Sequence, residues 1–294
     1  MRRLTKRLWL TAGKGGVGRS SVAAALARRA VRADRRVLAV DMVADGGTRR
    51  AVADGGTRRA VAGESARLEV VELELEAVVR EYVQLFLKIP IPATNIGPIK
   101  GIFDYVATAA PGVREILTIG KVVQELQTGP YDVVVADAPA TGHVVELLAA
   151  PENLASVVGV GPLTAQADRI GGSLRDHETT EVVLVTLPTE LAVNEALELH
   201  RRILDETEVA IGAVVVNQMP LTPGPDAVDR VGSSTAARVA QVRADDAAEQ
   251  RARLEGLDVP VIEVPIAVSG EAPVDVIDRA FDGAAAEHGW PVVR

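Results

Sequence analysis

Residues 11–21 combine glycines, two cations and three hydroxyls at spacings suited to holding a phosphate chain. They read TAGKGGVGRSS and follow a short apolar run. Gly13 and Gly18 keep the frame of a phosphate-binding loop, in which backbone N–H groups curl around phosphate oxygens that a Cβ would keep away. The helix expected to follow adds its positive end to this anion site. The residues predicted to bind a nucleoside triphosphate here are Gly13, Gly15, Gly16, Val17, Gly18, Arg19, Ser20 and Ser21.

Lys14 and Arg19 set this loop apart from the ordinary motif, which ends in Gly-Lys-Ser/Thr. Arg19 stands at the lysine position. It keeps the positive charge, but its planar guanidinium requires a different geometry from that of an ammonium. Two consequences are open: Arg19 clamps the β- and γ-phosphates, or it slows hydrolysis. Lys14 is an additional lysine directly after the first glycine, and it indicates which branch of phosphate-loop proteins is involved.

Two aspartates end apolar runs that read as strands beside the loop. Asp137 follows the run 132–136, at the place where phosphate-loop enzymes hold magnesium, usually through a water. Ser20 and Asp137 are therefore the predicted Mg²⁺ ligands. Asp41 follows the run 36–40 and is predicted to orient the water that attacks the γ-phosphate, with a turn-forming role as the alternative. Farther on, His143 either senses that phosphate or caps a helix.

A weaker pattern suggests where the base would lie. Asn217 closes the apolar run 213–216, and its amide offers one donor side and one acceptor side. That pair matches the hydrogen-bonding edge of adenine. The segment that begins at Pro265 supplies apolar atoms that could sandwich the base. Asn217 and Pro265 complete the predicted ATP-binding residues.

Short β-branched runs alternate with longer stretches rich in Ala, Leu, Glu and Arg, such as 20–33 and 190–204. This alternation predicts an α/β fold with a doubly wound parallel sheet, in which ligands lie beyond the carboxyl ends of the strands. We expect one phosphate-loop ATPase domain over residues 1–294. The expected strands are Leu8–Ala12, Arg36–Val40, Leu68–Leu73, Asp132–Ala136, Val182–Leu187, Ala213–Val216 and Val259–Val264.

Composition narrows the function further. The 294 residues are 48% hydrophobic and only 3% aromatic, with a net charge of −8 and no cysteine. The acidic balance argues against a nucleic-acid partner, because such binding needs clustered Lys and Arg. The absence of cysteine excludes disulfides, thiolate metal sites and cysteine nucleophiles. The apolar part of the N-terminus is too short for a signal peptide, so we expect a cytoplasmic protein.

Two segments interrupt the alternation. VADGGTRRA at 43–51 is repeated without change at 52–60. Because each Gly-Gly pair makes a continuous helix costly, at roughly 1 kcal/mol per glycine, we expect the repeat to lengthen a surface loop; a regulatory loop is the alternative. The segment 81–126 holds four of the six Phe and Tyr residues and lacks periodicity. It is predicted to be a helical insertion, with an apolar surface for a client, membrane or partner as the functional alternative.

Taken together, these residues resemble the arsenite-pump ATPase (ArsA) family, a branch of the deviant phosphate-loop ATPases that includes ATPases targeting tail-anchored membrane proteins. The loop matches the family's GKGGVGKTT except at Arg19, Ser20 and Ser21. Residues 137–143, DAPATGH, are similar to its second switch, DTAPTGH. Further likenesses, including one to actinobacterial anion-transporting ATPases, lie at 81–126, 111–115, 151–154, 161–168 and 217–218, so the resemblance covers nearly the whole chain.

The resemblance implies a homodimer, or a heterodimer of two paralogues, with ATP and Mg²⁺ held at the interface. Lys14 would then reach across to the partner's phosphates, Asp41 would activate water and Ser20 would bind magnesium. Because the chain has no cysteine, the thiolate metalloid site and the shared zinc of family members have no counterpart here.

The leading hypothesis is a magnesium-dependent ATPase whose cycle opens and closes a dimer and reshapes the 81–126 surface. The alternative from another class is a weakly active ATP-binding scaffold or regulatory subunit, which Arg19 favours. A chromosome-partition or division-site ATPase shares the Lys14-type loop but needs a basic surface or a basic C-terminal helix. The C-terminal stretch 274–287 is acidic instead.

Overall fold

The computed structural model describes residues 8–42, 47–54, 67–74, 77–78, 81, 112–158, 162–221 and 235–291. Within them, seven parallel strands form one sheet in the order β3-β2-β4-β1-β5-β6-β7. Each expected strand is present, so the predicted doubly wound α/β fold is confirmed. The strands are β1 Leu8–Gly13, β2 Val37–Asp41, β3 Leu68–Glu72, β4 Val133–Asp137, β5 Thr180–Thr186, β6 Ile211–Met219 and β7 Val261–Pro265.

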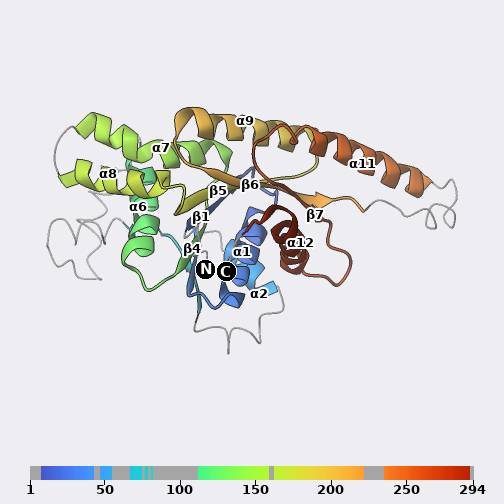
Figure 1. Cartoon of the computed structure of the whole chain (residues 1–294), viewed down its shortest axis with the longest axis horizontal. Helices are drawn as coiled ribbons and strands as arrows, with labels where there is room; N and C mark the ends of the chain where they lie inside the picture. The colour runs from blue at the N-terminus through green and yellow to red at the C-terminus, as the bar shows by residue number, and fades with distance from the viewer. Residues whose placement is uncertain are drawn as a thin grey trace.

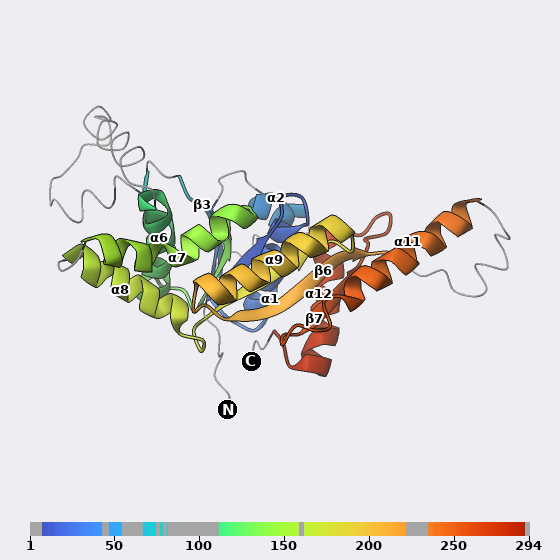
Figure 2. The same ribbon diagram turned by 90° about the horizontal axis from the view of Figure 1, so that it is seen from above.

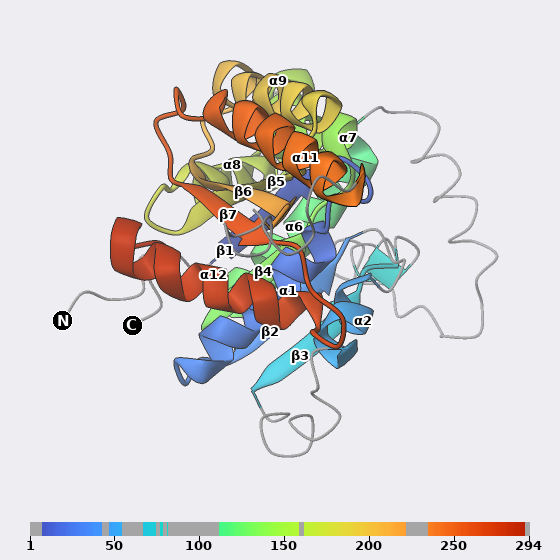
Figure 3. The same cartoon turned by 90° about the vertical axis from the view of Figure 1, so that its right-hand side faces the viewer.

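Helices cover both faces of the sheet, as Figures 1 and 3 show. One face packs against α1, α2 and α12 through a core rich in Ala and Val. The other packs against α6, α7, α8 and α9 through a core of Leu, Ile and Val. The helices are α1 Arg19–Arg32, α2 Gly47–Asp54, α6 Val113–Thr128, α7 Thr141–Val158, α8 Pro162–Arg175, α9 Glu190–Glu206, α11 Thr235–Ala252 and α12 Pro273–His288.

The topology places the phosphate loop at the middle of the sheet. The loop follows β1, which lies between β4 and β5. The chain leaves β1 toward β2 on one side and later builds β5 to β7 on the other side. In such sheets the carboxyl ends of the strands at this switch point form the ligand crevice.

The tandem repeat contains a helix, and the surface-loop prediction is wrong for residues 47–54. α2 begins at Gly47, the second glycine of the first pair, and ends at Asp54, before the second pair. The two Gly-Gly pairs therefore lie at the two ends of a short helix and do not interrupt a longer one. Thr48 is fully buried, so part of the first copy lies inside the molecule.

The segment 81–126 is described only at Glu81 and from Gly112 onward. Its last part is most of α6, whose apolar residues belong to the main core. Lys121 on α6 forms ion pairs with Glu81 and with Glu125, both at 2.8 Å. This part thus supports the central sheet. Residues 82–111, the rest of the segment predicted to carry a client surface, lie outside the described residues.

Acidic residues near the C-terminus hold α12 against α1. Arg28 pairs with Asp275 at 2.7 Å and Arg29 with Asp282 at 2.5 Å. Arg32 pairs with the buried Asp278. The acidic residues of α12 therefore form ion pairs with the basic residues at the end of α1.

α11 is less well packed than α12. Figure 2 shows it extending past the β7 edge of the sheet, and only its Ala244 and Ala247 are buried.

Among the described residues, no helix is long and apolar enough to cross a membrane.

Both tryptophans of the chain converge on one buried carboxylate. The indole Nε1 of Trp9 donates to Glu181 Oε1 at 2.7 Å, and that of Trp290 donates to the same oxygen at 2.8 Å. Gly212 leaves room for the carboxyl group, since a Cβ there would lie 2.4 Å from it. Through Trp290, Glu181 ties the segment after α12 to β1 and β5.

Replacing Glu181 with alanine is expected to lower the free energy of unfolding by about 3 kcal/mol, because two buried indole N–H groups lose their acceptor. Glu181→Gln keeps an acceptor oxygen and should lose less than half as much. Urea unfolding followed by tryptophan fluorescence measures both variants. Equal losses would mean that the charge, not the acceptor, matters.

Candidate nucleotide site

The phosphate loop has the backbone that its glycines predict. Gly13 and Gly18 adopt φ values of +156° and +96°. A Cβ on Gly13 would lie 2.2 Å from Val185 O, and one on Gly18 would lie 2.2 Å from Asn217 Nδ2. Both distances are too short for a Cβ atom, so only glycine fits at these two positions, where the loop packs against β5 and β6. Gly15 and Gly16 remain exposed, as access to a ligand requires.

α1 begins immediately after Gly18 and has no side-chain cap. The first N–H groups of a helix have no partners within the helix, and they carry the positive end of its dipole. Beside the loop, they form an anion site of the kind that binds phosphate. Arg19, Ser20 and Ser21 occupy the first turn, with side chains that are partly exposed.

Asp137 lies at the centre of a buried hydroxyl cluster. Ser20 Oγ donates to Asp137 Oδ2 at 2.5 Å, and Thr11 Oγ1 donates to Asp137 Oδ1 at 3.1 Å. Thr48 Oγ1 also donates to Asp137 Oδ2, at 3.4 Å. Asp41 is the register partner of Asp137 on the adjacent strand and is fully buried. The structure thus brings together Ser20, Asp137 and Asp41, which are 117 residues apart at the extremes.

Burial raises the pKa of Asp137 above its usual value. The hydrogen bond from Ser20, the charge of Arg19 and the hydrogen bond from Thr11 oppose this shift, whereas the charge of Asp41 adds to it. A carboxylate in such a place is stabilised by any cation that enters.

The donor set fits Mg²⁺ of the kind that accompanies a nucleotide. Within the described part of the chain, no group of three or more His, Cys, Asp or Glu residues is placed to hold a metal. Magnesium in nucleotide sites instead uses one or two protein oxygens, substrate phosphates and waters. The Ser20 hydroxyl and the Asp137 carboxylate, 2.5 Å apart, are oxygens of this kind.

Arg19 joins the loop to the segment after β4. Its guanidinium donates to the backbone oxygen of Ala138. This contact uses one of five donors, so the side chain keeps N–H groups for a ligand. Arg19 thereby links the position of the phosphate loop to that of residues 138–143. His143, near the start of α7, is exposed and lies 3.3 Å from Glu146.

Lys14 does not point freely into solvent. Its ammonium forms an ion pair with Glu195 Oε1 of α9 at 2.7 Å, with both side chains about one third exposed (39% and 32%). Glu195 Oε2 is buried and has no hydrogen-bond partner among the described residues. Within a single subunit, Lys14 is therefore held beside its own loop.

Asn217, on β6, contacts the phosphate loop directly. Its Nδ2 donates to Val17 O at 2.9 Å, and its Oδ1 accepts from the backbone N–H of Gln218 at 3.0 Å. Both sides of the amide are engaged within the chain, so reading adenine would require these bonds to exchange. Pro265 ends β7 and is exposed.

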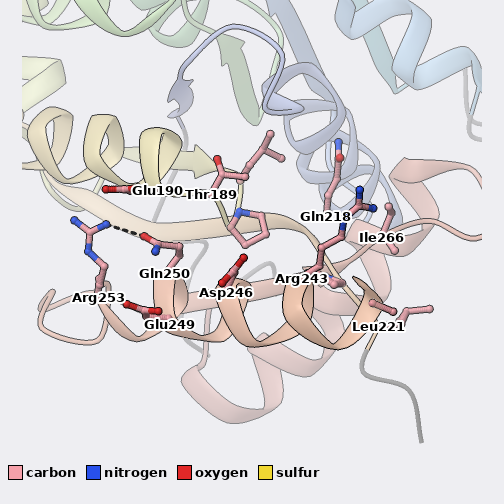
Figure 4. A pocket seen from close by; sticks show the side chains of 14 residues that line it. Thr189, Glu190, Gln218, Leu221, Arg243, Asp246, Glu249, Gln250, Arg253 and Ile266 are labelled. Atoms are coloured by element: carbon pink, nitrogen blue, oxygen red, sulfur yellow. Dashed lines mark hydrogen bonds between the residues drawn. The ribbon is translucent and has the colours of Figure 1, made fainter. Parts of the chain in front are cut away.

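A pocket of about 1010 Å³ begins next to these two residues. Gln218 and Ile266, which directly follow Asn217 and Pro265, lie along one side of it, as Figure 4 shows. The start of α9 and the exposed face of α11 form other walls, with Arg253 donating to Gln250 at 2.7 Å. The residues that directly follow the two predicted base-binding residues thus form part of a pocket wall.

Sequence reasoning missed two residues of this site. Thr48 was hidden because the Gly-Gly pairs around it argue against a helix. Glu195 lies 181 residues from Lys14 on an amphipathic helix, where an acidic residue resembles any solvated position. The signal available for Thr48 was its place seven residues after Asp41, within reach of the same sheet edge.

The glycine loop, the uncapped start of α1 and the Ser20–Asp137 pair on a seven-stranded parallel sheet define a phosphate-loop NTPase-like protein. The sequence profile of the family described as anion-transporting ATPase (ArsA_ATPase) matches residues 6–163, which is more than half of the chain. The chain belongs to this ATPase family.

Relatives from several organisms are named ATPases. ATPase BagA of Mycobacterium tuberculosis is 30% identical over 223 residues, covering 72% of this chain and 65% of BagA. ATPase GET3C of Arabidopsis thaliana is 25% identical over 269 residues, with 73% and 67% covered. ATPase ARSA1 of Chlamydomonas reinhardtii is 24% identical over 318 residues, with 89% and 40% covered. The match spans just under two thirds of the length of BagA.

Proposed function

We propose that this chain is a cytoplasmic, magnesium-dependent ATPase that works as a dimer, either with itself or with a paralogue. The observation that carries the proposal is the 2.5 Å contact between Ser20 Oγ and Asp137 Oδ2 at the mouth of the glycine loop. Family membership supports nucleotide binding. In the proposal, the nucleotide cycle drives a conformational change that handles a client or an anion.

Each residue has a proposed role. The N–H groups of residues 15–18 and the guanidinium of Arg19 bind phosphate oxygens, and Ser20 and Asp137 hold Mg²⁺. The ion, when bound, neutralises charge on the β- and γ-phosphates. Asp41 orients the attacking water and accepts a hydrogen bond from it, because its carboxylate lies on the strand beside Asp137.

In the proposal, dimer formation replaces the Glu195 partner of Lys14 by phosphates bound in the neighbouring subunit. The ammonium now pairs with Glu195 of its own subunit. A triphosphate in the neighbouring loop offers more negative charge than one carboxylate, so assembly around ATP would draw Lys14 across the interface. The partner would then complete each site in trans.

A weakly active nucleotide-binding subunit, paired with an active paralogue, is the second candidate. The contact between Arg19 and Ala138 O favours it, because that bond holds the guanidinium toward the segment after β4. In that case ATP binding would be retained while hydrolysis is slow, and the subunit would act as a scaffold or regulator. The segment 81–126 is the proposed place for a client or membrane partner, and no nucleic-acid partner is proposed.

A steady-state phosphate-release assay on the purified full chain separates these candidates. We expect wild-type turnover above that of Asp41→Asn by about 10²–10⁴-fold, the range for a positioned general base. Turnover equal to that of the variant, with ATP binding intact by calorimetry, would reject the enzyme and favour the second candidate. Recovery of turnover on mixing with a purified paralogue would identify a heterodimer.

A further inference from the structure

The tandem repeat delivers a buried hydroxyl to the proposed magnesium site. Thr48, the second residue of α2, is fully buried. Its backbone N–H donates to Asp41 Oδ2 and its Oγ1 donates to Asp137 Oδ2, both at 3.4 Å. One threonine therefore contacts both carboxylates that end adjacent strands.

The partner oxygen of Thr48 is also the partner of Ser20. Asp137 Oδ2 accepts from Ser20 Oγ at 2.5 Å and from Thr48 Oγ1 at 3.4 Å. Two hydroxyls, one from α1 and one from α2, thus contact one carboxylate oxygen. The Thr48 contact lies near the long limit of hydrogen bonding, whereas buried polar groups normally make close bonds. A hydroxyl that donates one hydrogen bond also has two acceptor lone pairs, which a cation beside Asp137 could use.

We propose that Thr48 would hold the magnesium ion as a second hydroxyl ligand, in addition to Ser20. The inference rests on the proposed function, since it assumes Mg²⁺–ATP at this loop. Magnesium takes oxygen ligands in octahedral geometry at about 2.0–2.1 Å, and a second hydroxyl replaces one of its waters. Ion binding would then fix α2, which packs against α1, and would connect the segment after Asp41 to the nucleotide.

Thr48→Val removes the hydroxyl at nearly constant volume, and Thr48→Ser keeps it. Thr57 occupies the same place in the second copy of the repeat and lies outside the described residues, so Thr57→Val is the matched control. Mn²⁺ binding to the full chain with a non-hydrolysable ATP analogue is followed by electron paramagnetic resonance. Thr48→Val should raise the Mn²⁺ dissociation constant about tenfold or more, while Thr48→Ser and Thr57→Val stay within about threefold.

A cysteine at the same position tests direct ligation. The chain has no cysteine of its own, so Thr48→Cys introduces a single thiol. A soft thiolate favours Cd²⁺ over Mg²⁺. If Thr48 touches the ion, analogue binding by Thr48→Cys, measured calorimetrically, should weaken with Mg²⁺ and recover with Cd²⁺. A residue that only positions Asp137 would show no such change of metal preference.

The outcomes distinguish failure of the proposed ATPase function from failure of the Thr48 inference alone. Failure of the wild-type chain to bind the analogue with Mn²⁺ would reject the proposed function and this inference with it. Wild-type binding that is unchanged in Thr48→Val and shows no Cd²⁺ preference in Thr48→Cys would reject the Thr48 ligand alone. Thermal unfolding identifies a variant that has not folded, and the serine and cysteine variants then decide the matter.

Discussion

Replacing Lys14 with alanine is expected to reduce ATP turnover by about 10³-fold or more, while ATP binding to a single subunit changes little. A cation supplied in trans to the transferring phosphoryl group contributes on this scale. Lys14 makes its ion pair with Glu195, and in the proposed site the phosphates of its own loop are bound by backbone groups and Arg19. Lys121→Ala is the matched control, because that lysine also forms ion pairs but lies on α6.

Mixing two inactive variants decides whether Lys14 acts across the interface. Lys14→Ala keeps Asp41, and Asp41→Asn keeps Lys14. In a mixed dimer, the site that contains Asp41 receives Lys14 from the neighbour and is complete, whereas the other site lacks both groups. Random mixing should restore about one quarter of wild-type turnover, because about half of the dimers are mixed and each has one working site. No recovery, with mixed dimers demonstrated by differential tagging, would place Lys14 in its own site.

The sheet was predictable because the physics of its strands is local. Runs such as Val133–Val135 are β-branched and fully buried, which is the pattern of parallel strands covered on both faces. The strand that precedes a glycine loop predicts where phosphate would bind, and Asp137 is predicted from its place at the end of its own strand. These inferences need no knowledge of partners elsewhere in the chain.

Contacts between distant elements were not predictable in this way. The ion pairs of α1 with α12 join residues about 250 positions apart, such as Arg29 and Asp282, and either partner alone resembles a solvated charge. The Lys14–Glu195 pair is hidden for the same reason. Helix propensity does not predict the position of Thr48, because the glycine pairs disfavour a helix. The first turn of α2 is instead held by two buried carboxylates, which propensity does not take into account.

Asp137→Asn is expected to stabilise the ligand-free protein and to abolish its function. Burial raises the pKa of this carboxyl, so the charged form is less favourable in the folded chain than in the unfolded chain. Removing the charge at neutral pH should raise Tm by about 2–4 °C, which corresponds to roughly 1 kcal/mol for a domain of this size. Mg²⁺-dependent ATP binding should fall by about tenfold or more, because a neutral amide is a poor ligand for the ion.

The pH dependence gives the sign of this effect independently. Since the folded-state pKa of Asp137 is raised, the wild-type fold binds a proton more tightly than the unfolded chain and gains stability as the pH falls through that pKa. The Tm difference between Asp137→Asn and wild type should therefore be largest at neutral pH and should disappear in acid. Differential scanning calorimetry across this range measures it.

Asp132 provides an opposite control close to the other end of β4. The hydrogen bond from the backbone N–H of Arg36 lowers the pKa of Asp132, and the Arg36 side chain adds to the shift. Its contribution is present at neutral pH and is lost as the pH falls through the lowered value. Asp132→Asn should therefore slightly lower Tm and leave ATP binding intact. If Asp137→Asn also lowered Tm without nucleotide, the hydrogen bonds from Ser20 and Thr11 would outweigh the cost of burying the charge.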